Sequence, residues 1–245
     1  EKKALNDLSL TLNDGDFCTV IGGNGAGKST LLNSIAGAYL PDSGTIEING
    51  KDVTKMSEYT RAKFIGRVFQ DPLKGTAAGM QVEENLLLAS RRGESRRLRW
   101  AFSAGDHDKY KAMVSRLDLG LEDRLSTRIG LLSGGQRQAL TLLMATIKRP
   151  EVLLLDEPTA ALDPKTAAKV LKITDEIVHE QHLTTLMITH NMKDALKYGN
   201  RLIMMNNGRI IADYSEDEKK NLTIDDLLKK FEETADAVSD RIVLG

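Results

Sequence analysis

The segment Gly22-Gly23-Asn24-Gly25-Ala26-Gly27-Lys28-Ser29 decides how this chain folds. It fits the pattern of a glycine, four further residues and Gly-Lys-Ser, which binds the phosphates of a nucleotide. An apolar run over 17–21 precedes it and another over 31–36 follows, so it lies where a predicted strand turns into a predicted helix. Glycines let the backbone approach phosphates closely, and backbone N–H groups converge there at the positive end of the helix dipole. The alternative, a glycine-rich turn without a ligand, leaves this strand-to-helix context unexplained.

The side chains of this loop suit a nucleotide that carries Mg²⁺. Lys28 supplies a mobile positive charge for the β and γ phosphates, and the Ser29 hydroxyl is a ligand for Mg²⁺. We therefore expect nucleotide contacts from the whole loop and the next position, namely Gly22, Gly23, Asn24, Gly25, Ala26, Gly27, Lys28, Ser29 and Thr30.

Composition bounds the class of protein. With 245 residues, 41% of them hydrophobic, the chain is long enough to bury one substantial core, and we expect one domain. A net charge of −1 gives no general reason to expect nucleic acid or anionic lipid as the main partner. The single cysteine, Cys18, precludes an internal disulfide and fits a reducing compartment. No apolar run approaches the ~18 residues that span a bilayer, and the first residues lack a signal-peptide core, so we expect a soluble chain that meets membranes through partners.

Strand and helix patterns alternate, which is typical of a mostly parallel α/β sheet. Apolar runs predict strands over 8–12, 16–21, 66–69, 152–155 and 184–188. Turn sequences at Asp14-Gly15, Asn49-Gly50 and Asn207-Gly208 predict hairpins. Capping and spacing predict helices from Lys28 to Gly37, over 82–88 and 109–117, and after Ser133, Asp163 and Thr223.

A helical insertion separates the sheet strands. Gln70 follows the strand over 66–69, at the sheet edge where open α/β folds bind ligands. From there to about Ile147 the pattern is helical and polar. Within it, 91–100 carries five arginines and a tryptophan, which suit lipid headgroups, RNA or an acidic partner. We favour a solvated charged insertion, because the flanks show little aromatic interleaving.

Two acids follow the apolar run over 152–155. Asp156, at the end of that strand, is placed to hold Mg²⁺ against the phosphates beside Lys28. Glu157 is a candidate general base for the attacking water. Solvated acids in a turn are the alternative, which the upstream phosphate loop disfavours.

A second anion site is predicted at Leu132-Ser133-Gly134-Gly135-Gln136. Adjacent glycines weaken a first helical turn, so something must approach that backbone. Ser133 is placed to cap the helix, and its N-terminus suits phosphate. The alternative is an ordinary helix start that contains glycine.

The order of these motifs, from the phosphate loop through Gln70, Leu132–Gln136, Asp156-Glu157 and Ala161-Leu162-Asp163 to His190, resembles the ATP-binding cassette (ABC) ATPases over nearly the whole chain. The resemblance implies a P-loop NTPase (RecA-like) α/β core with a mostly parallel sheet and an antiparallel β part, formed by 1–71 and 146–215. It also implies a helical subdomain over 72–145 that carries the signature motif and a C-terminal helical extension over 216–245.

The resemblance also implies roles for the matching residues. Two subunits pack head to tail around two ATP molecules with Mg²⁺, held by Ser29, Gln70 and Asp156. Gln70 senses the metal and the attacking water, Glu157 is the base, and His190 contacts the γ-phosphate. The segment Ser133, Gly134, Gly135 and Gln136 binds the nucleotide of the partner subunit, and Asp163 links the two sites.

Two departures from the family pattern are visible. The aromatic residue that stacks on adenine is expected upstream of Glu1, and Phe17 is too close to the loop and is expected to be core. Ala160 stands where many members have serine, and we expect little consequence.

The family resemblance also predicts partners and location. A chain without a fused membrane domain resembles bacterial importer subunits, which implies a homodimer or paralogous dimer, permease subunits docked near 71–80, and an extracytoplasmic solute-binding protein. The expected location is the inner face of the cell membrane, and the solute class that we favour is amino acids.

Two other classes of protein remain as alternatives. A soluble ABC ATPase that acts on nucleic acid or ribosomes is disfavoured, because Gln70 and Ser133 lie only 63 residues apart and one set of motifs is present. A kinase or GTPase is disfavoured by the segment 132–136 and by the lack of an Asn-Lys-x-Asp sequence.

Overall fold

The computed structural model of the chain describes residues 3–94, 103 and 105–243. Most of the predicted arginine cluster, from Ser95 onward, lies outside the described residues. The main sheet has the order β4-β5-β6-β1-β7-β8. Its strands are β1 (Phe17–Gly22), β4 (Ile65–Val68), β5 (Val152–Asp156), β6 (Thr185–Ile188), β7 (Arg201–Asn206) and β8 (Arg209–Tyr214). Only the β7–β8 pair of this sheet is antiparallel. The predicted α/β class is confirmed.

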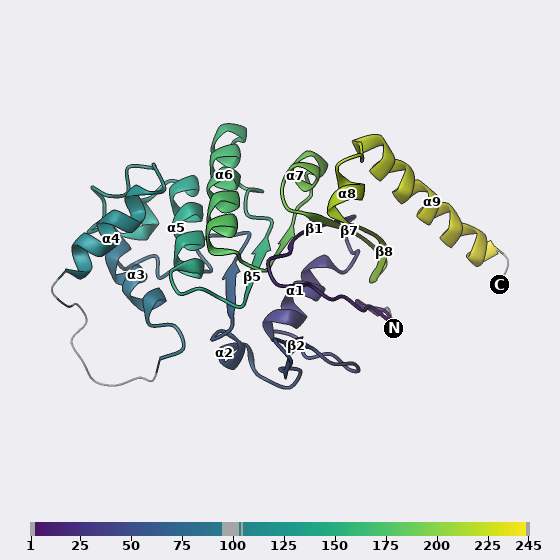
Figure 1. Cartoon of the computed structure of the whole chain (residues 1–245), viewed down its shortest axis with the longest axis horizontal. Helices are drawn as coiled ribbons and strands as arrows, with labels where there is room; N and C mark the ends of the chain where they lie inside the picture. Colours follow the sequence, from purple (N-terminus) through teal and green to yellow (C-terminus); the bar gives the residue numbers. More distant parts are fainter. Residues whose placement is uncertain (1–2, 95–102, 104, 244–245) are drawn as a thin grey trace.

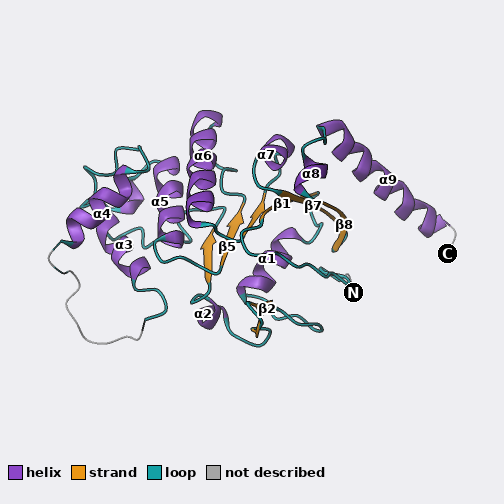
Figure 2. Ribbon diagram, viewed as in Figure 1, coloured by secondary structure: helices purple, strands orange, loops and turns teal. Residues whose placement is uncertain are grey.

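Helices cover both faces of this sheet (Figures 1 and 2). They are α1 (Lys28–Ala36), α2 (Glu58–Arg61), α3 (Val82–Ser90), α4 (Asp106–Ser115), α5 (Gly134–Thr146), α6 (Pro164–Gln181), α7 (Met192–Lys197), α8 (Glu216–Lys219) and α9 (Ile224–Val243), with a 3₁₀ turn at Ile129–Leu131. A separate hairpin joins β2 (Glu47–Ile48) and β3 (Lys51–Asp52). Helices α3 and α4 lie at one end of the molecule, and α9 extends from the other end (Figure 1).

Side chains of β5 point alternately to the two faces of the sheet, which explains why helices pack on both faces. Leu153 and Leu155 belong to the apolar cluster that includes residues of α5 and α6. Leu154, between them, belongs to the cluster that includes residues of α1. Because successive side chains of a strand point to opposite faces, a continuous apolar run is what a strand covered on both faces requires.

The predicted strand over 8–12 is wrong. Residues 8–12 form no strand, although Leu8, Leu10 and Leu12 pack against the cluster that includes α1. The predicted partner, β1, pairs with β6 along one edge and β7 along the other. A strand has two edges, so no hydrogen-bonding edge of β1 remains for a hairpin. The Asn49-Gly50 and Asn207-Gly208 hairpins are confirmed, whereas the short helices α2, α7 and α8 were not predicted.

Candidate nucleotide-binding site

The predicted phosphate loop joins β1 to α1. Gly25 and Gly27 have φ angles of 77° and 98°, in the left-handed region that favours glycine. A Cβ atom at Gly27 would lie 2.6 Å from the carbonyl oxygen of Ala4. Any other residue at this position would therefore displace the loop from the N-terminal segment that packs against it.

Lys28 is the first residue of α1, and its side chain turns back over the loop. Its Nζ donates to the carbonyl oxygens of Gly22 at 2.7 Å and Gly23 at 3.1 Å. The residue is only 5% exposed. Burial lowers the pKa of Lys28, while Glu157 and Asp156 counteract that shift. A bound polyanion would favour the charged ammonium further.

Three side chains that are far apart in sequence meet at the carboxyl edge of the sheet. Glu157 Oε1 lies 2.6 Å from His190 Nε2, and Gln70 Nε2 donates to Glu157 Oε2 at 3.1 Å. These residues follow β5, β6 and β4, which are neighbours in the sheet. The φ of Glu157 is 48°, and its backbone N–H donates to the carbonyl of Ile188 at 3.0 Å. Such a conformation is costly for a residue with a side chain, and it often occurs at functional sites.

The oxygen donors available beside Lys28 fit Mg²⁺. Ser29 offers a hydroxyl and Asp156 a carboxylate. The Gln70 amide nitrogen is used by Glu157, which leaves its carbonyl oxygen as a donor. Burial raises the pKa of Asp156, and Arg67 and Lys28 oppose that shift. Hard oxygen ligands in small number, completed by phosphate oxygens and water, are the usual environment of Mg²⁺.

The predicted signature segment begins α5 with a capping box. Ser133 Oγ accepts from the backbone N–H of Gln136 at 3.2 Å, and Gln136 Oε1 accepts from the N–H of Ser133 at 3.1 Å. A Cβ atom at Gly135 would lie 2.1 Å from Cγ2 of Thr166 on α6. A Cβ atom at Gly134 would lie 3.2 Å from Cδ2 of Leu162, so both glycines of the segment have a close neighbour within the chain itself.

Asp163 lies beside this contact, at the start of α6. Its Oδ1 accepts from the backbone N–H of Thr166 at 3.1 Å, so it caps α6 as predicted. The described hydrogen bonds of Ser133 stay within 133–137 and do not reach the phosphate loop. The structure thus groups the predicted residues into one cluster at the loop and another at the α5–α6 contact.

Several residues that enclose the carboxyl edge of the sheet, Asn33, Arg67, Phe69 and Ala161, were not predicted as site residues from the sequence, whereas Gln70 and Asp156 were. A cavity of about 510 Å³ is lined there by Asn33, Arg67, Phe69, Gln70, Asp71, Pro72, Lys74, Asp156 and Ala161. Arg67 Nη2 donates to Asn33 Oδ1 at 2.6 Å. A charged residue inside the otherwise apolar strand over 66–69 was the signal that could have identified Arg67.

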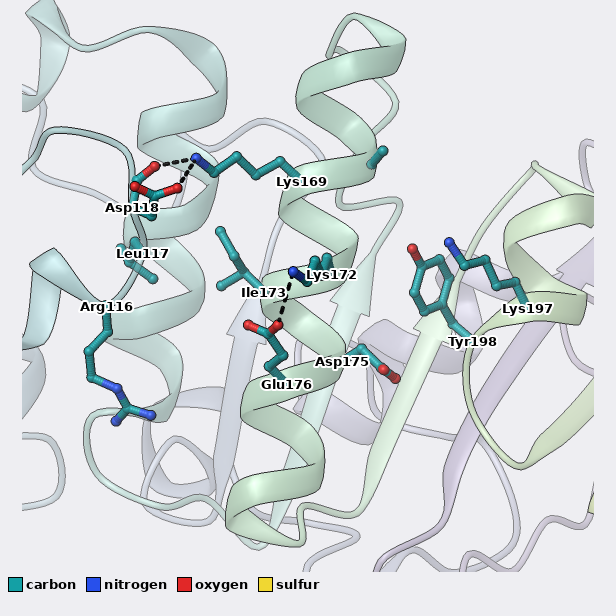
Figure 3. A pocket seen from close by; sticks show the side chains of 11 residues that line it. Arg116, Leu117, Asp118, Lys169, Lys172, Ile173, Asp175, Glu176, Lys197 and Tyr198 are labelled. Atoms are coloured by element: carbon teal, nitrogen blue, oxygen red, sulfur yellow. Dashed lines mark hydrogen bonds and ion pairs between the residues drawn. The ribbon is translucent and has the colours of Figure 1, made fainter.

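A second cavity, of about 570 Å³, lies over α6, between residues 116–118 and 197–198 (Figure 3). Leu117 and Ile173 are the larger apolar side chains among its lining residues, with Tyr198. Lys169 donates to Asp118 Oδ2 at 2.8 Å, and Lys172 pairs with Glu176 at 3.6 Å. Because these charges pair within the protein and none of the predicted site residues lines this cavity, we do not assign a ligand to it.

The family model described as ABC transporter matches residues 5–160. The chain belongs to this ABC transporter family. It is 46% identical over 226 residues to a tyrosine transport ATP-binding protein of Clostridioides difficile (strain R20291), covering 92% of this chain and 90% of that protein. It is 33% identical to the phosphonates import ATP-binding protein PhnC of Lactococcus lactis subsp. cremoris (strain SK11), with 93% of each chain covered.

A solved structure supports the fold of this ABC ATPase. It is the dimeric post-hydrolysis state of the ATP-binding cassette MJ0796 bound to ADP and phosphate, with 26% identity and a TM-score of 0.73, covering 87% of this chain and 90% of that one. The chain is thus an ABC ATPase, whose ATP hydrolysis is coupled to transport. Among the described residues, no helix is both long and apolar enough to cross a bilayer.

Proposed function

We propose that Glu157 is the general base of ATP hydrolysis and that Gln70 and His190 orient it. The observation that carries this proposal is the cluster in which both carboxylate oxygens of Glu157 have a partner, a hydrogen bond from Gln70 on one and a close contact with His190 Nε2 on the other. A base held from two sides keeps its position when water attacks the γ-phosphate. Lys28 and the backbone N–H groups of residues 22–30 bind the phosphates. Mg²⁺ held by Ser29, Asp156 and Gln70 would neutralise charge on the phosphates.

In the same proposal, two copies of this chain, or a copy and a paralogue, share each nucleotide. Ser133, Gly134, Gly135 and Gln136 bind the γ-phosphate of ATP seated on the loop of the partner, and Asp163 connects the two sites. The capped N-terminus of α5 supports this role, since backbone N–H groups at a helix start favour anions. The solved dimer of a similar cassette supports the arrangement.

The Glu157→Gln variant tests the catalytic assignment. Glutamine keeps the size of the side chain and loses the proton acceptor, so hydrolysis is expected to fall by about 10²-fold or more. The affinity for ATP is expected to stay within about twofold of the native value. In the presence of ATP, the variant should accumulate as a dimer, which size-exclusion chromatography with light scattering detects. Lys28→Ala is the matched control, because it should lose ATP binding and the dimer together. A Glu157→Gln variant with full activity would remove Glu157 from the proposed mechanism.

We further propose that the chain drives the import of a small solute, with amino acids as the favoured class. The names of the tyrosine transport and phosphonates import relatives support this direction. The proposed assembly contains permease subunits, which hold the ATPase at the inner face of the membrane, and an extracytoplasmic solute-binding protein.

The permease is proposed to dock beside the segment 71–80. Leu73 in this segment and Leu88 on α3 are 40% and 55% exposed. Tyr39 and Leu40, which follow α1, are also exposed. The end of α3 packs near the end of α2, since a Cβ atom at Gly93 would lie 3.3 Å from Cγ of Lys63. Exposed apolar side chains on neighbouring elements favour a protein partner.

Uptake by cells tests the transport proposal. Cells that express the chain with its permease should accumulate radiolabelled tyrosine, and cells with the Glu157→Gln variant should not. Unlabelled amino acids and phosphonate are added in turn as competitors. Uptake of a labelled phosphonate but of no labelled amino acid would contradict the favoured solute class, while the assignment of Glu157 would stand.

A further inference from the structure

Arg67 connects three elements around the catalytic edge of the sheet. It lies in β4 opposite Leu154, a residue of the face covered by α1. Its guanidinium donates through Nη2 to Asn33 of α1 at 2.6 Å and through Nη1 to Glu58 of α2 at 3.3 Å. It also lies over the ring of Phe69, 4.4 Å from the ring centre. The Arg67 side chain is 13% exposed, so these contacts form largely away from water.

Through Asn33, Arg67 is connected to α1, the helix that begins at the phosphate loop. Asn33 is five residues after Lys28 on the same helix, which places it about 7.5 Å along the helix axis from the phosphate-binding turn. α1 is one continuous helix over Lys28–Ala36, so its first turn and Asn33 belong to the same hydrogen-bonded element. A shift of α1 on phosphate binding would therefore reach Asn33 and the side chain bonded to it.

Through Phe69, Arg67 is connected to the segment that contains Gln70. Phe69, on which the guanidinium stacks, is adjacent to Gln70 in the chain, and Gln70 donates to Glu157. Both Arg67 and Gln70 line the cavity at this edge, together with Asn33. The guanidinium has a fixed fork of donors, so it holds two acceptors in a defined relative position, which a flexible ammonium does not.

We propose that Arg67 is a positioning residue for hydrolysis: it ties the nucleotide-binding helix α1 to the Gln70 segment through Asn33 and Phe69. Phosphate bound at the loop then fixes the position of Gln70 beside Glu157. The bond to Glu58 extends the same connection to α2, beside the exposed apolar residues proposed as the permease contact. This inference rests on the catalytic role proposed for Gln70 and Glu157.

The test separates nucleotide binding from turnover. Arg67→Met keeps much of the side-chain volume and removes the guanidinium group with its hydrogen bonds to Asn33 and Glu58. The kcat for ATP hydrolysis by the full chain is therefore expected to fall about tenfold or more. The dissociation constant for a fluorescent ATP analogue is expected to stay within about twofold, because Arg67 does not line the phosphate loop. Arg67→Lys, which keeps only the charge, should recover part of kcat at most.

Variants of Asn33 test whether the hydrogen bond between Asn33 and Arg67 is the interaction that matters. Asn33→Ala should lower kcat in the same way, whereas Asn33→Asp, which keeps the acceptor, should retain it within about twofold. Adding Asn33→Ala to Arg67→Met should cost little more, because both changes remove the same bond. Arg149→Met is the matched control, since Arg149 likewise donates to two acceptors, the carbonyl groups of Gln181 and His182, and it does not line the cavity.

Three outcomes would overturn the inference. The first is a kcat that stays within twofold in Arg67→Met while Gln70→Ala loses hydrolysis. The second is a proportional loss of ATP affinity and thermal stability, which a structural role alone would produce. The third is independent, additive losses from Arg67→Met and Asn33→Ala. If Gln70→Ala and Glu157→Gln keep full hydrolysis, the proposed catalytic roles fail instead.

Discussion

At the residue scale, the buried side chain of Arg61 stabilises the C-terminal end of α1, the helix that begins at the phosphate loop. Its guanidinium donates to the carbonyl oxygens of Ser34 at 2.6 Å and Ile35 at 2.9 Å, in the last turn of α1, and to those of Thr54 and Met56. It therefore donates to two of the last carbonyl groups of α1, one of which, that of Ser34, also accepts from the Gly37 N–H at 3.2 Å.

Arg61→Met is expected to lower the free energy of unfolding by about 3 kcal/mol or more, because four carbonyl groups lose the charged guanidinium as a donor at a buried position. Urea denaturation followed by circular dichroism measures this loss. Arg149→Met, which removes bonds to two carbonyl groups in an exposed position, should cost less than about 1 kcal/mol. Equal losses in the two variants would contradict the assigned role of Arg61.

At the element scale, the contact between α5 and α6 separates two reasons for the glycine at 135. Gly135→Ala should destabilise the protein, because the new methyl group meets Thr166, although alanine alone favours a helix by about 1 kcal/mol. Adding Thr166→Ala should restore the melting temperature. ATP hydrolysis should remain low, since we propose that the partner's phosphate also approaches this backbone. Full recovery of hydrolysis in the double variant would limit the role of Gly135 to packing.

Helix α8 carries a second element-scale prediction, on pH. Lys219 is 5% exposed and donates to the carbonyl groups of Tyr198 and Gly199. Burial lowers its pKa from 10.5 to about 8. Below about pH 8 the folded and unfolded chains both hold this proton. Above it the unfolded chain binds more protons, so stability rises with pH until about pH 10.5.

The measurement compares the native protein with Lys219→Met. Between about pH 7 and about pH 9.5, the native protein should gain roughly 1.5 kcal/mol in free energy of unfolding relative to the variant. The difference between the two proteins removes the contribution of other titrating groups. A difference that falls as pH rises would show that the ammonium in the folded state is stabilised by its two carbonyl acceptors more than burial destabilises it.

At the scale of the whole molecule, the proposed head-to-tail dimer predicts complementation between inactive variants. Lys28→Ala removes the loop lysine, and Ser133→Ala removes the hydroxyl of the opposing segment. In a mixed dimer one site carries both changes and the other carries neither. Random pairing of the two variants thus leaves about a quarter of all sites intact. Mixing two variants that hydrolyse little ATP alone should therefore restore measurable hydrolysis, and rates that only average would contradict a shared site.

The sequence by itself was enough to locate the phosphate loop, the helix that follows it, the acids after β5 and the Asn-Gly hairpins. These signals are local: glycine and asparagine at positive φ, capping groups and apolar runs act within a few residues. The sequence order of these motifs also indicated the ABC family, which the comparisons confirm. The residues that we propose as catalytic, Gln70, Glu157 and His190, could be named because each follows a predicted strand.

Only the tertiary structure decided which strands are neighbours. Residues 8–12 have the pattern of a strand, yet β6 and β7 occupy both edges of β1. The bond of Arg67 to Asn33, the contact of Thr166 with Gly135 and the meeting of Gln70 with Glu157 likewise join residues 31 or more positions apart. Such pairings depend on the order of the sheet and the packing of helices on it. No local pattern specifies them, because each is set by the free energy of the whole core.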